Sequence, residues 1–329
     1  MELNRTMNTG TLDTDIADCL QVNGRASWTL IADVIGQPER TVARRGQHLL
    51  DSGLVRVSAY LDEARLNAVD ALLMRVYVQQ GGTARVADVL AQRRDAYSVT
   101  AFPGSNRVEG LFLPVGLNPV DEIANRLLTG MEGVVGSELA RITRAYRRGH
   151  QWHGGRLDTA ARGRLLKDVV ADDESSCDAL ELTDQDRIIT GIMERDGRTA
   201  VKEIAEAAGV TSQFIGRRMR ALFRSGLLQM RTEVSPEISG LALEAHLRLQ
   251  VDAARVDELG RHLAQDPAIM YCVATTGSHP IECIVKLPAL SDLHQWTTQT
   301  VGAFPGVVVT ECETEPRQVR RANILFPQE

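Results

Sequence analysis

Hydrophobic residues recur with helical spacing in two similar segments, TVARRGQHLLDSGLV at residues 41–55 and FIGRRMRALFRSGLL at residues 214–228. In the second segment they fall at i, i+4, i+7 and i+8, which places them on one face of a helix: Ile215, Met219, Leu222 and Phe223. Gly53 and Gly226 follow the helical runs, where a left-handed C-terminal cap is expected. The spacing therefore predicts two equivalent helices, each with one face in a hydrophobic core.

These two helices belong to a longer repeat. A shift of 173 residues aligns the chain with itself without a gap, and the register holds over about 135 residues. The matched residues include polar ones: Asp13 with Asp186, Gly24-Arg25 with Gly197-Arg198, Arg44-Arg45 with Arg217-Arg218, Arg75 with Arg248, Gly104-Ser105 with Gly277-Ser278, Glu109 with Glu282, and Glu138 with Glu311. The chain is therefore predicted to contain one unit twice.

The first part of each copy has helical spacing throughout. It predicts three helices with a tight turn at Gly36 or Gly209 before the third, which is the outline of a helix-turn-helix. Thr211 is a good N-cap for the third helix of the second copy, whereas Pro38 at the corresponding place is a poorer cap. The aliphatic pair that follows each third helix suits a short strand or wing.

The second part of each copy changes period. The second copy predicts strand, helix, strand, strand, helix and strand at residues 245–251, 252–267, 269–277, 281–287, 289–304 and 306–314, and the first copy repeats this order from about 71 to 142. This is the ferredoxin-like βαββαβ order, and the predicted fold class is α+β. The predicted segments are a helix-turn-helix at 1–58, a ferredoxin-like domain at 67–148, a linker at 151–181, a second helix-turn-helix at 182–232 and a second ferredoxin-like domain at 241–317.

Composition narrows the class of protein. The chain has 329 residues, is 43% hydrophobic and carries a net charge of −6, which argues against indiscriminate nucleic-acid binding but not against a local basic face. Its five cysteines are scattered, which favours free thiols in a reducing cytoplasm over disulfides or a metal site. We see no secretory signal, membrane span or cofactor motif, and expect a cytoplasmic protein without metal or cofactor.

The third helices differ in charge. Residues 212–225 carry four arginines and no acid, a local charge of +4, whereas residues 39–52 carry a local charge of +1. The pattern predicts duplex DNA binding, mainly by the second copy, although arginines on a helix also occur as a plain solvated face. The candidate contacts are Thr211, Ser212, Gln213, Arg217, Arg218, Arg220, Arg224, Arg40, Thr41, Arg44 and Arg45.

A helix-turn-helix followed by a βαββαβ domain resembles the Lrp/AsnC (feast/famine) family of transcriptional regulators. The residues that carry the resemblance are Asp13 and Asp186, the Gly-Arg pairs, and VTSQFIGRRMRALFRSGLL, which ends in a small residue, glycine and an aliphatic residue. The resemblance implies a DNA-binding module, an oligomerising RAM/AsnC-type domain and an amino-acid effector. Family members usually have one copy per chain, so this chain would be a tandem version.

Both copies lack the aspartate of the family's Gly-x-x-Asp turn, so either the effector differs from an ordinary amino acid or the chain senses no effector through this turn. The candidate effector contacts are Thr275, Thr276, Gly277, Ser278, His279, Gly104, Ser105 and Asn106, for which the alternative is an ordinary turn. We expect a homo-oligomer with an even number of helix-turn-helix units, in which copies pair either within a chain or between chains.

An enzyme is the alternative from another class. The sirohaem decarboxylases have the same double layout, but their resemblance would require a histidine-rich strand that reads like His-Asn-Tyr-x-Arg. The corresponding stretches, residues 96–102 and 269–277, contain no histidine. No catalytic triad, paired carboxylates or phosphate loop stands out either, so no catalytic residue is predicted and the sequence favours a regulator over an enzyme.

Overall fold

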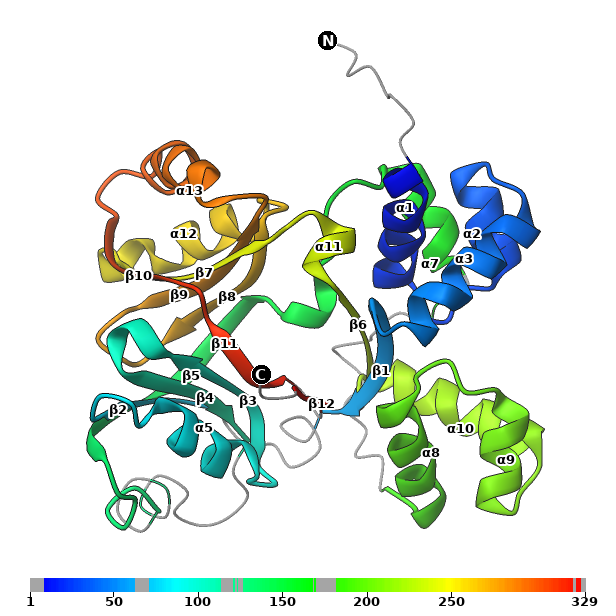
Figure 1. Cartoon of the computed structure of the whole chain (residues 1–329), viewed down its shortest axis with the longest axis horizontal. Helices are drawn as coiled ribbons and strands as arrows, with labels where there is room; N and C mark the ends of the chain where they lie inside the picture. Colours follow the sequence, from blue (N-terminus) through cyan, green and yellow to red (C-terminus); the bar gives the residue numbers. More distant parts are fainter. Residues whose placement is uncertain are drawn as a thin grey trace. The chain divides into compact units, whose positions relative to one another are not determined.

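The computed structural model describes residues 9–62, 71–113, 121, 123, 127–167, 169, 182–321 and 324–326. The chain divides into two compact units, one formed by residues 1–62 and 150–242 and the other by residues 63–149 and 243–329 (Figure 1). The first unit therefore contains both helix-turn-helix modules, and the second contains both sheet domains. No helix among the described residues is long and apolar enough to cross a bilayer.

The predicted three-helix arrangement is confirmed in both copies. The first unit contains α1 (Thr9–Val22), α2 (Trp28–Ile35), α3 (Glu39–Asp51), β1 (Val55–Leu61), α7 (Thr159–Leu166), α8 (Asp184–Arg195), α9 (Val201–Ala208), α10 (Ser212–Arg224), β6 (Leu228–Val234) and α11 (Pro236–Ser239). Thr211 caps α10 by accepting the N–H of Phe214, whereas Pro38 gives α3 no side-chain cap. Gly36 and Gly209 have φ values of 66° and 65°, a left-handed conformation that suits glycine.

The two helix-turn-helix modules are joined to each other by a two-stranded ribbon. β1 pairs antiparallel with β6, from Val55 opposite Val234 to Leu61 opposite Leu228. Each module also binds the other through an arginine that follows a glycine. Arg25 donates to the carbonyl oxygens of Gly197 and Thr199 at 2.5 and 3.0 Å, and Arg198 donates to those of Gly24 and Ala26 at 2.6 and 3.0 Å.

Both glycines are required because the modules approach closely. A Cβ atom at Gly24 would lie 3.2 Å from Oγ1 of Thr232, and one at Gly197 would lie 3.0 Å from the backbone of Ser58, each in the other module. Both distances are shorter than most Cβ contacts in proteins, so a larger residue would push the modules apart. The Gly-Arg pair of each copy is therefore a contact between the modules.

Part of the predicted linker at 151–181 belongs to the first helix-turn-helix, which corrects that assignment. Leu165 on α7 is fully buried in the same hydrophobic core as α1 and α2. Arg156, before the helix, forms two 2.6 Å hydrogen bonds with the buried carboxylate of Asp18. An apolar anchor and an ion pair thus fix this stretch, while the segment beyond residue 169 lies outside the described residues.

The second unit confirms the predicted βαββαβ order in its second domain, and in its first domain the helix predicted before the last strand lies mostly outside the described residues. The first domain contains β2 (Leu72–Val78), α5 (Thr83–Ala91), β3 (Ala96–Phe102), β4 (Arg107–Phe112) and β5 (Val134–Arg147). The second contains β7 (Leu243–Gln250), α12 (Val256–Leu263), β8 (Ile269–Thr275), β9 (Ile281–Leu287), α13 (Leu290–Trp296), β10 (Val308–Thr314), β11 (Arg317–Arg321) and β12 (Ile324–Leu325). Short turns of helix are η1 (Pro103–Ser105), η3 (Gly149–Gln151), η4 (Ala253–Arg255) and η5 (Thr297–Val301).

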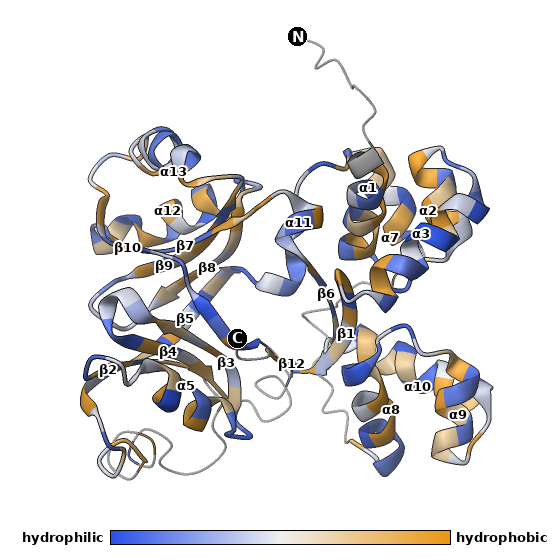
Figure 2. Ribbon diagram, viewed as in Figure 1, coloured by the Kyte–Doolittle hydropathy of each residue, from blue (hydrophilic) through white to orange (hydrophobic). Residues whose placement is uncertain are grey.

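The strand order within each domain is that of a ferredoxin-like sheet, β5-β2-β4-β3 and β10-β7-β9-β8, with antiparallel neighbours. β9 shows why these segments form half-buried strands, because its residues alternate between a buried and a less buried side. Figure 2 shows this strand as largely hydrophobic. The buried side carries Ile281, Cys283, Val285 and Leu287. These side chains pack in one core with residues of α12.

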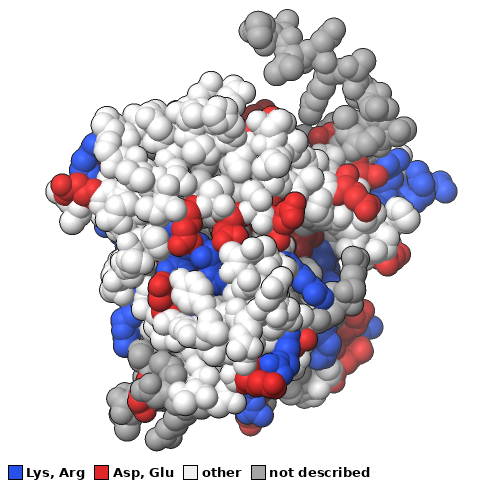
Figure 3. Space-filling view, turned by 60° about the vertical axis from the view of Figure 1, so that its left-hand side comes forward, with Lys and Arg blue, Asp and Glu red and all other residues white. Residues whose placement is uncertain are grey.

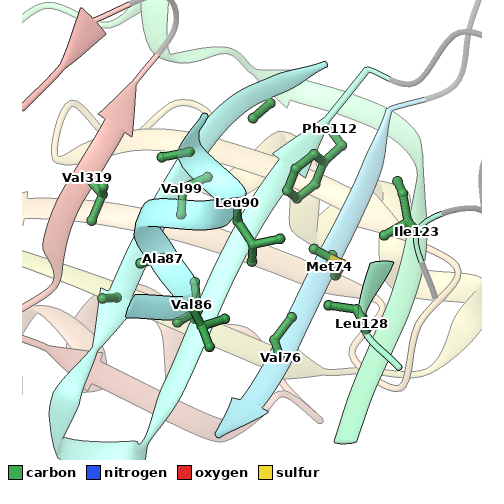
Figure 4. Close-up of a cluster of buried hydrophobic side chains, with 14 of the residues drawn as sticks. Met74, Val76, Val86, Ala87, Leu90, Val99, Phe112, Ile123, Leu128 and Val319 are labelled. Carbon is green, nitrogen blue, oxygen red and sulfur yellow. The ribbon is translucent and has the colours of Figure 1, made fainter. Parts of the chain in front are cut away.

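The two domains exchange the ends of their fourth strands. The end of β5 pairs with β8 of the second domain, and β11, which follows β10, pairs with β3 of the first domain. Tyr146 on β5 packs against the hydrophobic core of the second domain. A Cβ atom at Gly260 of that domain would overlap the ring of Tyr146. The equivalent residue of the other copy, Val319 on β11, lies in the first core together with Ala87, the equivalent of Gly260 (Figure 4).

The arginines that follow Tyr146 and Val319 add hydrogen bonds between the two domains. Arg147 donates from Nη1 to the carbonyl oxygens of Asp266 and Ile269 at 2.7 and 2.8 Å. Its equivalent, Arg320, donates from Nη1 to the carbonyl oxygens of Ala91 and Arg93, both at 2.8 Å. The two ferredoxin-like domains are therefore paired within the chain, each closed by a strand of the other.

The fit between Tyr146 and Gly260 gives a test by mutation. Gly260→Ala is expected to lower the free energy of unfolding by about 1–3 kcal/mol, because the added methyl group overpacks against the ring. Tyr146→Val in the same chain makes this contact equivalent to that of Val319 and Ala87, and is expected to recover most of the loss. Thermal unfolding by calorimetry of the single and double variants measures the coupling.

Gly191→Ala on α8 is the control, because no atom lies within 4 Å of the position that its Cβ would occupy. This change is expected to leave stability equal or raise it by up to about 1 kcal/mol. A double variant that loses as much as the two single variants together would show that the ring and the glycine are not coupled.

Candidate nucleic-acid interface

One side of α10 is exposed and basic. Gln213, Arg217, Arg220 and Arg224 are all exposed, and none of them forms a hydrogen bond or ion pair with another residue that the structure describes. The opposite side carries Ile215, Met219 and Leu222, which are buried. At the start of the helix Thr211 and Ser212 are also exposed, next to backbone N–H groups that favour an anion.

Arg218 has a different role from its neighbour Arg217. Its Nε and Nη2 atoms donate to the two carboxylate oxygens of Asp186 on α8, both at 2.6 Å. Arg45 forms the same pair of 2.6 Å hydrogen bonds with Asp13 on α1. The structure therefore gives both predicted DNA contacts an internal role, in which they tie the third helix of each module to its first helix.

Asp186 remains ionised in a buried place. Its side chain is fully buried. Burial acts to raise the pKa of this carboxyl group, but the hydrogen bonds from Arg218 and Thr183 outweigh it and hold the pKa below its ordinary value. The aspartate that the sequence shares between the two copies is therefore the acceptor of a buried charge-assisted clamp.

The corresponding side of α3 is less basic. Arg40 and Arg44 are exposed and form no hydrogen bond or ion pair with another described residue, and Thr41 is half-buried. Gln47 and Asp51 occupy the places of Arg220 and Arg224, and Gln47 donates to Asp51 at 2.8 Å. Glu39 accepts a hydrogen bond from Thr29 at 2.9 Å. The basic side of the helix is thus shorter in the first copy.

The predicted effector residues lie in two turns of the second unit. Gly104 and Ser105 belong to η1, and Asn106 follows them in a left-handed conformation with φ 52°. In the other turn Thr275 donates to the carbonyl oxygen of His279 at 2.7 Å and accepts from the N–H of Gly277. Thr276 accepts a hydrogen bond from the N–H of Arg141, and Ser278 is exposed.

The two turns meet at Glu311 on β10. Its carboxylate binds Nη1 of Arg107, next to the first turn, at 2.7 Å and lies 3.6 Å from Nε2 of His279 in the second turn. Nδ1 of His279 lies 2.9 Å from the hydroxyl group of Thr310. Burial, followed by the charge of Arg75, lowers the pKa of His279 below its ordinary value, although Glu311 acts in the opposite direction.

Glu311 is one member of a charge cluster between the two domains, in which the arginines are buried. Arg75 binds Glu282 and Glu138, and its equivalent Arg248 binds Glu109 and Glu311. Side-chain exposure is only 5% for Arg75 and 2% for Arg248, so both depend on these carboxylates for their hydrogen bonds. Figure 3 shows acidic and basic side chains next to each other on one face of the molecule.

The sites predicted from the sequence do not include this cluster, although the sequence contains a signal for it. Arg75, Glu109 and Glu138 recur as Arg248, Glu282 and Glu311 at the same places of the repeat. Charged residues kept in two copies of a strand are unusual on a plain solvated face, where any polar residue serves. The identity of their partners could not be predicted, because each arginine binds a glutamate of the other domain.

Comparisons with known proteins agree with this architecture, although no family model matches the chain. The chain is similar to the HTH-type transcriptional regulator FL11 of Pyrococcus horikoshii, at 28% identity over 127 residues, which are 38% of this chain and 83% of the relative. It is also similar to LrpA of Pyrococcus abyssi, at 23% identity over 125 residues, which are 38% of this chain and 89% of the relative.

Two solved structures, both of the same enzyme, match the fold over almost the whole chain. The siroheme decarboxylase NirDL has a TM-score of 0.60 and 13% sequence identity, over 95% of this chain and 94% of that chain. Two helix-turn-helix modules and two ferredoxin-like domains define the class of tandem helix-turn-helix proteins. In sequence, the chain is similar to HTH-type transcriptional regulators that include LrpA.

The clamp between Arg218 and Asp186 predicts a difference between two adjacent arginines. Arg218→Ala is expected to lower the free energy of unfolding by about 3–5 kcal/mol, because it leaves a buried carboxylate without its charged partner. Arg217→Ala is expected to change it by less than about 0.5 kcal/mol, since that side chain is exposed. Urea unfolding followed by circular dichroism measures both, and equal losses would contradict the internal role of Arg218.

The same clamp predicts a pH dependence. Because the pKa of Asp186 is depressed in the folded state, its stabilisation is complete above the unfolded-state pKa of about 3.9 and is lost as the pH falls through the lower folded-state pKa. The stability difference between the wild type and Arg218→Ala is therefore expected to narrow from pH 7 toward pH 3. A constant difference across this range would show that Asp186 is not the titrating partner.

Proposed function

We propose that this protein is a sequence-specific regulator of transcription that binds double-stranded DNA through α10 and α3 and is not an enzyme. The observation that supports this most directly is the exposed side of α10, where Arg217, Arg220 and Arg224 have no acidic partner among the described residues. Arginine is the usual ligand of phosphate and guanine, and an unpaired row of arginines on a third helix fits a duplex groove. The similarity to HTH-type transcriptional regulators supports the same function.

The roles of these side chains follow from their places on the helix. Residues at the start of a recognition helix reach base edges in the major groove, so Ser212, Gln213 and Arg217 are the proposed base contacts. Thr211 and the later arginines, Arg220 and Arg224, are proposed to hold phosphates. Arg218 and Arg45 are excluded from both roles by their bonds to Asp186 and Asp13.

The first copy contributes less affinity in this proposal. Arg40, Thr41 and Arg44 can contact DNA, but the helix lacks the later arginines and ends in Asp51. Each phosphate contact releases condensed counterions, so the copy with more unpaired arginines supplies more of the binding free energy and more of its salt dependence.

Two variants that each remove two positive charges test this asymmetry. Arg217→Ala/Arg220→Ala is expected to weaken binding to a selected operator by about 10- to 100-fold and to lower the salt slope by about 1, through the lost phosphate contact of Arg220. Arg40→Ala/Arg44→Ala is expected to have a smaller effect. Fluorescence anisotropy at several salt concentrations measures both.

Arg261→Ala is the control for loss of charge, because Arg261 is an exposed residue of α12 outside the helix-turn-helix unit. It is expected to leave the affinity unchanged. Equal losses in the two double variants would reject the asymmetry, and no retention of the wild type on any duplex would reject the proposed function.

A small amino-acid-like effector at the two turns of the second unit is part of this proposal. The candidate contacts are the residues predicted from the sequence, Thr275–His279 and Gly104–Asn106. The contacts of Glu311 with His279 in one turn and with Arg107, directly after the other turn, support a shared site, and that carboxylate is 33% exposed. The paired domains of one chain already supply two helix-turn-helix modules, and assembly into a homo-oligomer remains a prediction.

A second candidate function is the decarboxylation of a sirohaem-like tetrapyrrole. The similarity to the siroheme decarboxylase NirDL over 95% of this chain favours it, although at 13% identity this similarity shows the fold alone. The strands β3 and β8, which would correspond to the histidine-rich strand, contain no histidine. A shift of the visible absorption bands of sirohaem on addition of the purified protein, followed by its conversion, would favour this enzyme over the regulator.

A further inference from the structure

We propose that the DNA site bound by one chain is not palindromic, because α3 and α10 present different specificity-determining residues, Arg40 and Gln213, to equivalent base pairs. This inference rests on the proposed function, since it requires that both helices bind DNA. It adds a prediction that the function alone does not contain, namely that the two halves of the site differ at a defined position.

The two helices are held as a matched pair within one unit. The ribbon of β1 and β6 joins the two modules through seven opposed residue pairs. The reciprocal bonds of Arg25 and Arg198 to backbone carbonyl groups repeat the same contact in each direction. Related halves of a protein held in this way present equivalent positions to the two halves of a DNA site.

Arg40 and Gln213 occupy the same place in this pair. Each is the second residue of its helix, in α3 (Glu39–Asp51) and α10 (Ser212–Arg224), and they are 173 residues apart in the chain. Both side chains are exposed, and neither forms a hydrogen bond or ion pair with another described residue. Arg44 and Arg217, one turn later, are identical, so the difference lies at the start of the helix.

The chemistry of these side chains predicts the difference between the half-sites. Arginine donates two parallel hydrogen bonds to O6 and N7 of guanine, whereas a glutamine amide donates to N7 and accepts from N6 of adenine. The half-site of the first copy is therefore expected to carry guanine where the half-site of the second copy carries adenine. The identical arginines, Arg44 and Arg217, are expected to select the same base in both halves.

The binding also has a direction. Gln47 and Asp51 on α3 replace Arg220 and Arg224 on α10, so one end of the site is held by more phosphate contacts than the other. A chain bound in reverse would place each helix on the wrong half-site. Any second chain in an assembly would repeat the same directional unit.

Selection of sites from random duplex DNA by the full-length protein tests this inference. The wild type is expected to select a site whose shortest unit has two unlike halves. Arg40→Gln is expected to make the two halves alike at the position concerned, with adenine in both, and Gln213→Arg is expected to place guanine in both. The double variant Arg40→Gln/Gln213→Arg is expected to exchange the two bases.

Competition by anisotropy gives the size of the effect. Replacement of the preferred base at one half-site is expected to weaken wild-type binding about 10-fold, and the matching variant is expected to restore it. Arg187→Gln on α8, an exposed residue outside the third helices, is the control and should leave the selected site unchanged. Circular dichroism of each variant shows whether it is folded.

Three outcomes separate the inference from the proposed function. Unlike halves that follow the substitutions support the inference. A symmetrical site, or unlike halves that ignore both substitutions, overturns the inference and leaves the proposed function in place. Absence of any enriched site, together with no retention of the wild type on duplex DNA, overturns both.

Discussion

Both units depend on pairing between the two copies of the repeat. Each helix-turn-helix module pairs with the other, and each ferredoxin-like domain pairs with the other. Four arginines form this pairing by donating to backbone carbonyl groups of the other copy: Arg25, Arg198, Arg147 and Arg320. A hydrogen bond from a charged donor contributes about 1.5–3 kcal/mol, and its removal leaves a desolvated carbonyl group without a partner. Neither a single helix-turn-helix nor a single sheet domain of this chain completes these contacts alone.

Much of the fold could be predicted from the sequence because its signals are local. Helical spacing, the cap at Thr211 and the left-handed glycines depend on residues close together in the chain, and the spacing and the glycines occur in both copies. The packing of α7 could not be predicted in this way, since its short amphipathic pattern also suits an exposed helix. Its place depends on Leu165, which is buried only because α1 and α2 lie beside it.

The candidate DNA interface could be predicted in part for the same reason. Periodicity placed Arg217, Arg220 and Arg224 on the side of α10 away from the core, and the structure has them exposed there. It could not separate Arg217 from Arg218, since adjacent residues on a helix point about 100° apart and only the position of α8 decides which one meets Asp186. Of the adjacent arginines on α10, Arg217 is therefore exposed, whereas Arg218 forms an internal ion pair.

The two exchanged strands pack against residues of different size, and this difference affects which domains can pair with each other. Tyr146 needs the space over Gly260, whereas Val319 matches the larger Ala87. If like domains of two chains paired, one interface would contain a crowded ring and the other an empty volume, and both are destabilising. Pairing of the two different copies is therefore favoured over pairing of like copies. This preference disfavours mixed assemblies with other chains.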